Sequence, residues 1–168
     1  MKGNLTFRSA KESDFSRIQE IAMKGWLFSY SYLPEKELTK LVDKYYSDKS
    51  LSGSLKRVKE GTDLFIVAEA EKKIIGFCHV TAKSRVGEIV RLYLDTGYIG
   101  KGIGKKLLVR SEEFLKAKGC KKLFTFVNMH NRIGMDFYLR NHFVHIGEKD
   151  TEDEFRNGKV LWYMEKSL

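Results

Sequence analysis

Three glycines stand close together in the middle of the chain, where the sequence reads LYLDTGYIGKGIGKKLL. Gly100, Gly102 and Gly104 lie within five residues, with lysines between and after them. They follow a segment with strand character and precede one with helical spacing. A glycine-rich turn that opens a helix presents backbone N–H groups to an anion, and the helix dipole adds a favourable field. The spacing therefore predicts a binding site for a compact polyanion.

Two common phosphate-binding motifs do not fit this turn. A P-loop requires Ser or Thr after the lysine, and Lys105 is followed by another lysine. A dinucleotide-binding fingerprint requires a third glycine where Leu107 stands. The alternative is a glycine-rich helix start that binds no ligand. Each glycine inside a helix lowers the stability of that helix by roughly 1 kcal/mol, which a turn without a ligand would not offset. We therefore favour a ligand-binding turn of another kind.

The net charge of +9 first suggests a nucleic-acid partner, but the charge is unevenly distributed. Residues 98–122 contain eight basic and two acidic residues, whereas residues 148–154 contain five acidic residues and one lysine. A local basic patch suits a compact polyanion better than a long one. We find no helix-turn-helix, RNP, KH or zinc-finger pattern, so a basic nucleic-acid-binding module is kept as an alternative of another class.

Other properties of the chain limit its class. The 168 residues suit one domain, residues 1–168, and no apolar run approaches the roughly 20 residues that span a bilayer. The N-terminus lacks the apolar core of a signal peptide, so we expect a cytoplasmic protein. Cys78 and Cys120 are expected to be reduced, and the four histidines show no metal-binding spacing. We expect no metal.

Apolar periodicity predicts the elements that position the turn. Ser9 and Glu12 have the spacing of a capping box at the start of the first helix. The order of strand, helix and strand that begins at residue 88 requires the two strands to be parallel, with the helix as the crossover. The hairpins before and after it require antiparallel pairing. The fold class is α/β, with a mixed, mostly antiparallel sheet of about seven strands flanked by about four helices. We place strands near 5–8, 63–70, 74–80, 88–94, 122–127, 144–148 and 159–165, and helices near 15–22, 34–45, 102–118 and 131–141.

At the turn the sequence resembles the GCN5-related N-acetyltransferase (GNAT) superfamily, whose signature is Q/R-x-x-G-x-G/A between a strand and a helix. Gly102 and Gly104 match its glycines, and Ile99 stands where the family has Gln or Arg. The family binds the pyrophosphate of coenzyme A mainly through backbone amides, so this departure removes one side-chain contact. Glu88 lies eleven residues before Ile99, the spacing of the general-base glutamate in histone acetyltransferases of this superfamily.

A second motif lies downstream and resembles the same family. Asn131, Gly134 and Tyr138 fit its helix N-x-x-A-x-x-x-Y, with glycine in place of alanine. YLRNHF resembles its Y-x-x-x-G-F, with His142 where glycine is usual. The two motifs together cover residues 88–147 most densely, and the order of elements extends the resemblance over nearly the whole chain.

The resemblance implies the GNAT fold and direct transfer of an acetyl group from acetyl-CoA to a primary amine. Tyr138 would protonate the leaving thiolate, and a backbone N–H within Leu92–Leu94 would stabilise the developing oxyanion. Glu88 would take the proton of the amine, directly or through water; a solvated or paired carboxylate is the alternative. The residues assigned to acetyl-CoA are Leu92, Tyr93, Leu94, Ile99, Gly100, Lys101, Gly102, Ile103, Gly104, Lys105, Asn131 and Tyr138.

The acceptor site in this family corresponds to residues 25–38 and 148–158. Their aromatic rings and carboxylates suit a cationic amine, and they resemble microbial polyamine acetyltransferases of the PaiA type, which act on spermidine or spermine. A protein N-terminus or lysine is the alternative acceptor, and a non-catalytic acyl-CoA sensor is a further alternative. We expect no nucleic-acid or membrane partner and leave a homodimer as a possible assembly. The acceptor-site residues are Trp26, Tyr30, Glu35, Glu37, Asp150 and Glu152.

Overall fold

The computed structural model describes residues 4–31, 33–149 and 161–168. The N-terminal part contains β1 (Leu5–Ser9), the short 3-10 helix η1 (Glu12–Asp14), α1 (Phe15–Ser29), α2 (Glu35–Tyr46) and α3 (Asp48–Lys59). The remainder contains β2 (Asp63–Ala70), β3 (Lys73–Lys83), β4 (Val86–Leu94), η2 (Thr96–Tyr98), α4 (Ile103–Ala117), β5 (Lys122–Asn128), α5 (Arg132–Arg140), β6 (Val144–Lys149) and β7 (Leu161–Ser167).

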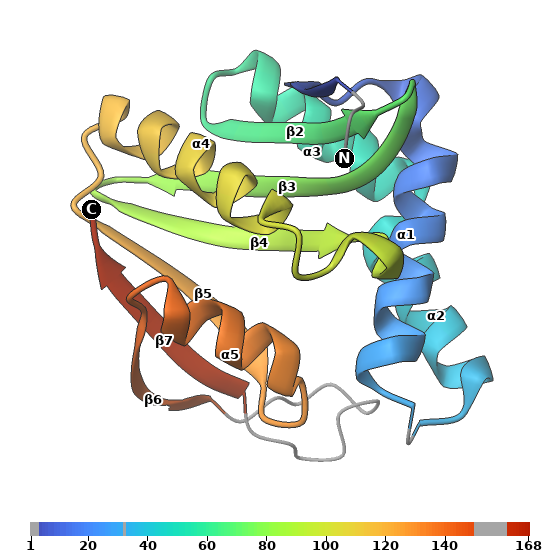
Figure 1. Ribbon diagram of the computed structural model, residues 1–168. Coiled ribbons are helices and arrows are strands. Elements are labelled where there is room, and N and C mark those ends of the chain that lie inside the picture. The colour runs from blue at the N-terminus through green and yellow to red at the C-terminus, as the bar shows by residue number, and fades with distance from the viewer. Residues whose placement is uncertain (1–3, 32, 150–160) are drawn as a thin grey trace.

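The strands form one seven-stranded sheet with the order β1-β2-β3-β4-β5-β7-β6 (Figure 1). The pair β4–β5 is parallel, and α4 is the crossover between these strands; the other neighbouring pairs are antiparallel. The mixed, mostly antiparallel α/β fold predicted from the sequence is therefore confirmed.

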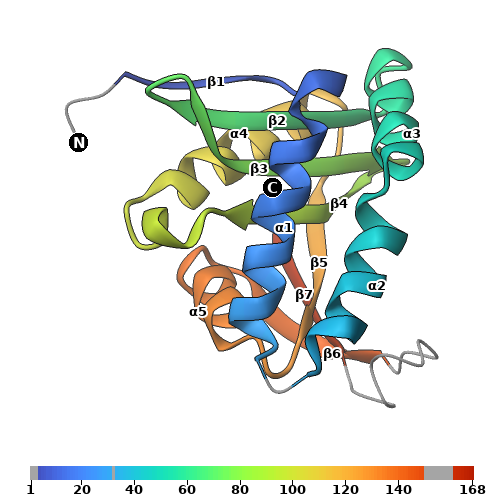
Figure 2. The same ribbon diagram turned by 90° about the vertical axis from the view of Figure 1, so that its right-hand side faces the viewer.

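Helices cover both faces of this sheet, α4 and α5 on one face and α1, α2 and α3 on the other (Figures 1 and 2). Alternate residues of β2 point to two separate cores, as strand geometry requires. Ile66 and Ala68 join the core under α4, whereas Phe65 and Val67 join the core under α1, α2 and α3. The sheet thus separates two differently built halves of the molecule.

Two details of the N-terminal half differ from the sequence prediction. Ser9 still belongs to β1, and the carboxylate of Asp14 accepts a hydrogen bond from the Lys11 N–H at 2.9 Å, so the predicted capping box of Ser9 and Glu12 is wrong. Helix α3 was not predicted, because its buried positions include a serine, Ser54, beside Leu51. Across the described ranges, every helix is too short or too polar to cross a lipid bilayer.

Candidate active site

The two parallel strands β4 and β5 part at the centre of the sheet. Their registered pairs run from Val86 opposite Lys122 to Glu88 opposite Phe124, and end there in the described part of the chain. A register shift follows in β4, where Ile89 pairs with Val80 of β3 and the next paired residue is Arg91. This bulge at residue 90 turns the strand away from β5. The Thr125 hydroxyl of β5 still donates to the Ile89 carbonyl at 3.2 Å, and from residue 90 onward β4 has no registered pair with β5 in the described ranges.

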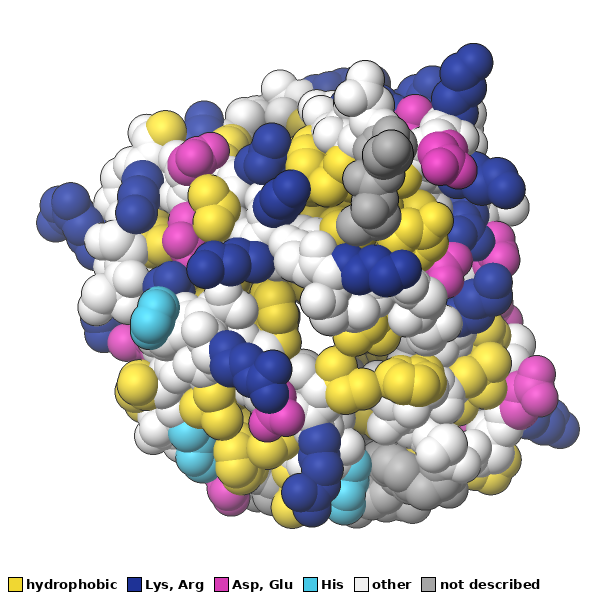
Figure 3. Space-filling view, viewed as in Figure 1, with side chains coloured by type: hydrophobic (Ala, Val, Ile, Leu, Met, Phe, Trp, Pro, Cys, Tyr) yellow, Lys and Arg dark blue, Asp and Glu magenta, His cyan; other side chains and the backbone are white. Residues whose placement is uncertain are grey.

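A cavity of about 580 Å³ occupies this opening. Its walls come from residues 89–94 of β4, residues 125–128 of β5, the C-terminal turn of α1, the glycine turn and α5. Because α1 and α5 lie on opposite faces of the sheet, the cavity connects the two faces. Figure 3 shows the molecule hollowed on the side of α4 and α5, with hydrophobic side chains at the opening and Lys and Arg side chains around it.

The glycine turn forms one end of the cavity. Gly100 and Gly102 have φ of +79° and +77°, a left-handed conformation that disfavours other residues, and Gly102 is the N-cap of α4. The first N–H groups of α4 have no partners within the helix and are available to a ligand. Lys105 also lines the cavity. Backbone donors and one cation are the groups that bind a pyrophosphate.

Helix α5 supplies the two predicted side chains of the second motif. The side-chain oxygen of Asn131 accepts the Gly134 N–H at 2.9 Å and caps the helix. A Cβ on Gly134 would lie 2.8 Å from the Asn131 amide nitrogen, so an alanine here would require the Asn131 side chain to shift. Asn131 and Gly134 both line the cavity.

Tyr138 also lines the cavity, and 7% of it is exposed. Burial raises the pKa of its phenol above the ordinary value of 10, and the neighbouring Cys78 adds to this increase, whereas a hydrogen bond with Thr125 opposes it. The phenol is therefore neutral at physiological pH. A neutral hydroxyl in a cavity of this kind can donate a proton to a leaving group.

Glu88 lies at the last β4–β5 pair, next to Ile89, the first residue of β4 that lines the cavity. The glutamate is half-buried, and it is not one of the described residues that line the cavity. Burial raises the pKa of its carboxyl, and the charge of Lys149 opposes that increase. A carboxylate with this environment has a higher proton affinity than an exposed one.

The predicted acetyl-CoA residues come together around the cavity, apart from two. Ile103 is fully buried in the core, and the amino group of Lys101 lies 4.9 Å from the ring centroid of Tyr98. The predicted residues that line the cavity are Leu92, Tyr93, Leu94, Ile99, Gly100, Gly102, Gly104, Lys105, Asn131 and Tyr138.

The predicted acceptor residues are more dispersed. Tyr30 lines the cavity, and Trp26 is buried behind it with 5.4 Å between the two ring centroids. Glu35 and Glu37 lie in the first turn of α2 and do not line the cavity. Asp150 and Glu152 lie outside the described residues.

Several cavity residues were not predicted from the sequence, notably Arg91, Phe126, Asp136 and Arg140. Arg91 carried a signal, since it is a charged residue within the otherwise apolar segment IVRLYL. In the described ranges, His, Cys, Asp and Glu do not gather in groups of three or more that could hold a metal ion.

Comparisons with known proteins agree with this architecture. The profile of the acetyltransferase (GNAT) family matches residues 17–143. The spermidine N(1)-acetyltransferase of Thermoplasma acidophilum is 30% identical over 142 residues, which cover 83% of this chain and 88% of that protein. The crystal structure of PaiA N-acetyltransferase from T. acidophilum in complex with coenzyme A has a TM-score of 0.86 and 28% identity, and covers 98% of this chain and 99% of that chain. Ard1 of Thermoplasma volcanium shares the fold, with a TM-score of 0.76 and 16% identity, and covers 98% of this chain and 97% of that chain.

Proposed function

Since the chain belongs to the acetyltransferase (GNAT) family, we propose that it transfers the acetyl group of acetyl-CoA to a primary amine of a polyamine such as spermidine or spermine. The observation that carries this proposal is the cavity between the parted strands β4 and β5. It is open to both faces of the sheet, so a donor and an acceptor can enter from opposite sides and meet at the main chain of β4.

The residues at one end of the cavity fit the donor. Acetyl-CoA supplies the acetyl group as an activated thioester and carries a pyrophosphate. The N–H groups at the start of α4 and the amino group of Lys105 would bind that pyrophosphate. A Cβ at Gly100 or Gly102 would meet no atom within 4 Å, so the space beside the turn is open. Asn131 would contact the pantetheine arm.

Two groups of the chain would act on the reacting atoms. A backbone N–H within Leu92–Leu94 would donate to the carbonyl oxygen of the thioester and stabilise the negative charge that develops there. Tyr138 would donate its phenolic proton to the sulfur as the thiolate leaves, and its raised pKa keeps that proton in place until then.

Glu88 is our candidate for the base. An alkylamine has a pKa of roughly 10.4 and must lose a proton before it attacks. Glu88 lies next to the cavity wall, where burial raises the pKa of its carboxyl. Since it does not line the cavity, we propose that it accepts the proton through a water molecule.

The acceptor assignment is supported by the relative and by the aromatic side of the cavity. The 30% identical relative is named as a spermidine acetyltransferase. Phe28 and Tyr30 line the cavity at the end of α1, and aromatic faces attract ammonium groups. Glu35 and Glu37 lie at the start of α2, just after these rings, and we expect Asp150 and Glu152 to add further carboxylates.

The experiment is an acetyl-CoA turnover assay, by thiol release, with polyamines, amino acids, aminoglycosides and peptides. We expect the highest kcat/KM with spermidine or spermine. Preference for a peptide would contradict the polyamine assignment while keeping the acetyltransferase. Coenzyme A binding without thiol release from any amine would contradict catalysis and favour a sensor.

A further inference from the structure

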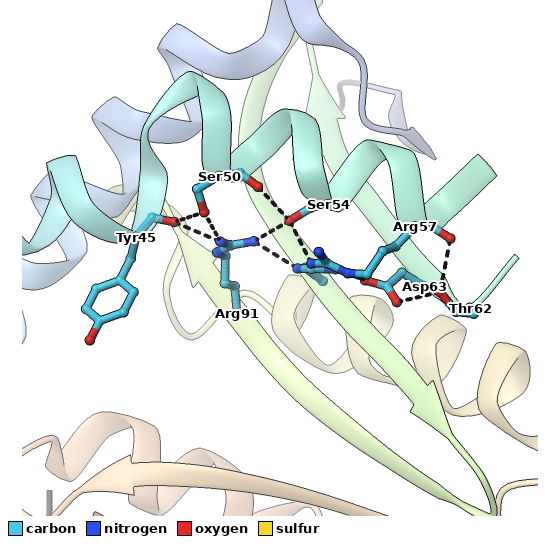
Figure 4. Close-up of polar contacts among 8 residues, drawn as sticks. Tyr45, Ser50, Ser54, Arg57, Thr62, Asp63 and Arg91 are labelled. Carbon is cyan, nitrogen blue, oxygen red and sulfur yellow. Dashed lines mark hydrogen bonds and ion pairs between the residues drawn. The ribbon is translucent and has the colours of Figure 1, made fainter. Parts of the chain in front are cut away.

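A buried polar network connects β4 to the helices on the acceptor side of the sheet. Asp63 of β2, His79 of β3 and Arg91 of β4 lie in a row across three neighbouring strands. All three are buried, with between 0% and 8% of each residue exposed. Figure 4 shows Arg91 reaching the junction of α2 and α3, where Tyr45, Ser50 and Ser54 surround its guanidinium group.

The hydrogen bonds fix the protonation of His79. Arg91 can only donate, so the Nδ1 atom of His79, at 2.9 Å, must be the acceptor. The Nε2 atom then carries the proton and donates to the Asp63 carboxylate at 2.7 Å. The imidazole is therefore neutral, and burial lowers its pKa, which is consistent with this arrangement.

Arg91 holds several separate segments together. One guanidinium nitrogen donates to Ser54 at 3.1 Å, and the other donates to the backbone carbonyl of Tyr45 at 2.8 Å and to Ser50 at 3.1 Å. Among the described residues, none of its hydrogen-bond acceptors is a carboxylate. Such a cation is costly to bury, and burial lowers its pKa. A group retained at that cost has a structural or functional role.

The position of Arg91 suggests which role. It is the first paired residue after the bulge at residue 90, immediately before Leu92–Leu94. Among the described residues, β4 has no registered partner on the β5 side beyond Glu88, so β3 and side-chain anchors hold it in place, including the bond from Thr125 to the Ile89 carbonyl. We propose that Arg91 is a positioning residue: through the α2–α3 junction it fixes the Leu92–Leu94 amides against the acceptor side of the cavity. This inference rests on the function proposed above.

The test compares Arg91→Gln with Arg57→Gln. Arg57 bonds Asp63 at 2.8 Å and donates to Ser54 at the longer distance of 3.3 Å, and its side chain is 46% exposed. For Arg91→Gln we expect kcat to fall about 10- to 100-fold and KM for the amine to rise, because small displacements of reacting groups have effects of this size. KM for acetyl-CoA should stay within about twofold, since Arg91 bonds the α2–α3 junction, on the face of the sheet opposite α4 and its glycine turn. Arg57→Gln should retain kcat.

Hydrogen exchange supplies a readout that does not depend on turnover. The amides of residues 92–94 should exchange faster in Arg91→Gln than in Arg57→Gln at matched global stability. Equal exchange in the two variants, or equal kcat, would overturn the positioning role and leave a purely structural network. If no amine supports turnover in the wild-type protein, the proposed function fails, and the exchange comparison still decides this inference.

Two milder variants keep the proposal testable if Arg91→Gln does not fold. Ser50→Ala removes one acceptor of Arg91, and Arg91→Lys keeps the charge but cannot reach all four acceptors in the same geometry. Both should lower kcat less than Arg91→Gln and leave KM for acetyl-CoA unchanged. Wild-type kcat in both variants would overturn the proposal.

Discussion

The two sides of the cavity are built in different ways. On the side of the glycine turn, the chain offers mainly backbone: the N-terminus of α4, opened by two glycines with positive φ, and the exposed edge of β4. On the side of α1, α2 and α3, it offers side chains: an aromatic cluster that includes Trp26 and Tyr30, backed by the network of Arg91, His79 and Asp63.

This difference separates two kinds of requirement. A backbone site depends on where glycines allow unusual φ angles and on where a strand ends, and it tolerates changes of the surrounding side chains. A side-chain site depends on the position of each group, because a buried polar atom that loses its partner has no solvent to replace it. Substitutions on the two sides should therefore have separable effects on donor binding, turnover and stability.

Tyr138→Phe should have the largest effect on turnover. It tests the side chain that we propose as proton donor to the leaving thiolate, on the side of the cavity that holds the glycine turn. We expect turnover to fall by at least about 100-fold, because a general acid is lost. Coenzyme A affinity, measured by calorimetry, should not change. Tyr163→Phe is the matched control, because Tyr163 bonds Glu165 on β7 and does not line the cavity; it should keep full activity. Full activity in Tyr138→Phe would show that another group is the proton donor.

Gly25→Ala should have the next largest effect, on the side-chain side. A Cβ at Gly25 would lie 2.7 Å from Cδ1 of the Tyr93 ring, which packs against Tyr46 and Phe77. Overpacking of this kind lowers the free energy of unfolding by about 1–3 kcal/mol. A Cβ at Gly53 in α3 would make only an ordinary contact, at 3.8 Å from a guanidinium nitrogen of Arg57. Gly53→Ala should therefore raise the free energy of unfolding by about 0.5–1 kcal/mol. Urea unfolding measures both; the same sign in both variants would contradict this packing.

Gly102→Ala should have a smaller effect on stability and a selective effect on the donor. The added Cβ meets no atom within 4 Å, so the cost is the positive φ alone, about 1–2 kcal/mol. We expect several-fold weaker coenzyme A binding and an unchanged KM for the amine. Gly97→Ala, also in open space but without positive φ, should change stability by less than about 0.5 kcal/mol. A raised KM for the amine in Gly102→Ala would remove the distinction between the two sides.

A pH titration is the mildest test, and it concerns the network alone. Burial and the neighbouring Arg91 and Arg57 lower the pKa of His79, although Asp63 opposes this effect. The unfolded chain therefore binds this proton more readily than the folded one. The stabilisation that depends on a neutral His79 is fully present above pH 6.5, the ordinary pKa of histidine. It declines as the pH falls below that pKa. His79→Gln should show less of this decline between pH 7.5 and 5.5 in urea unfolding; an equal decline would assign it to other groups.

The sequence predicted the backbone side well and the side-chain side poorly, for a physical reason. Glycine spacing and strand periodicity are local, so the turn at Gly100–Gly104 and the parallel crossover were predicted from short segments. Tyr138 was predicted from the resemblance of a short motif, Asn131 to Tyr138, to the GNAT family. The network joins residues 45 to 91 through the folding of α2, α3 and three strands, and no short segment contains it. The available signals were single polar residues inside apolar strands, Arg91 and His79, and their partners could not be inferred from spacing.

The parting of β4 and β5 also sets a limit on how this protein can be improved. A sheet in which the two strands remained paired to their ends would bury more backbone and unfold less readily. The same pairing would occupy the N–H groups that the cavity needs and would fill the passage between the two faces. Selection for heat resistance should therefore leave this gap unchanged and accumulate stabilising substitutions elsewhere, at positions such as Gly53. Stability and activity compete at the centre of the sheet, and can be optimised independently only at helix positions that do not hold the Arg91 network.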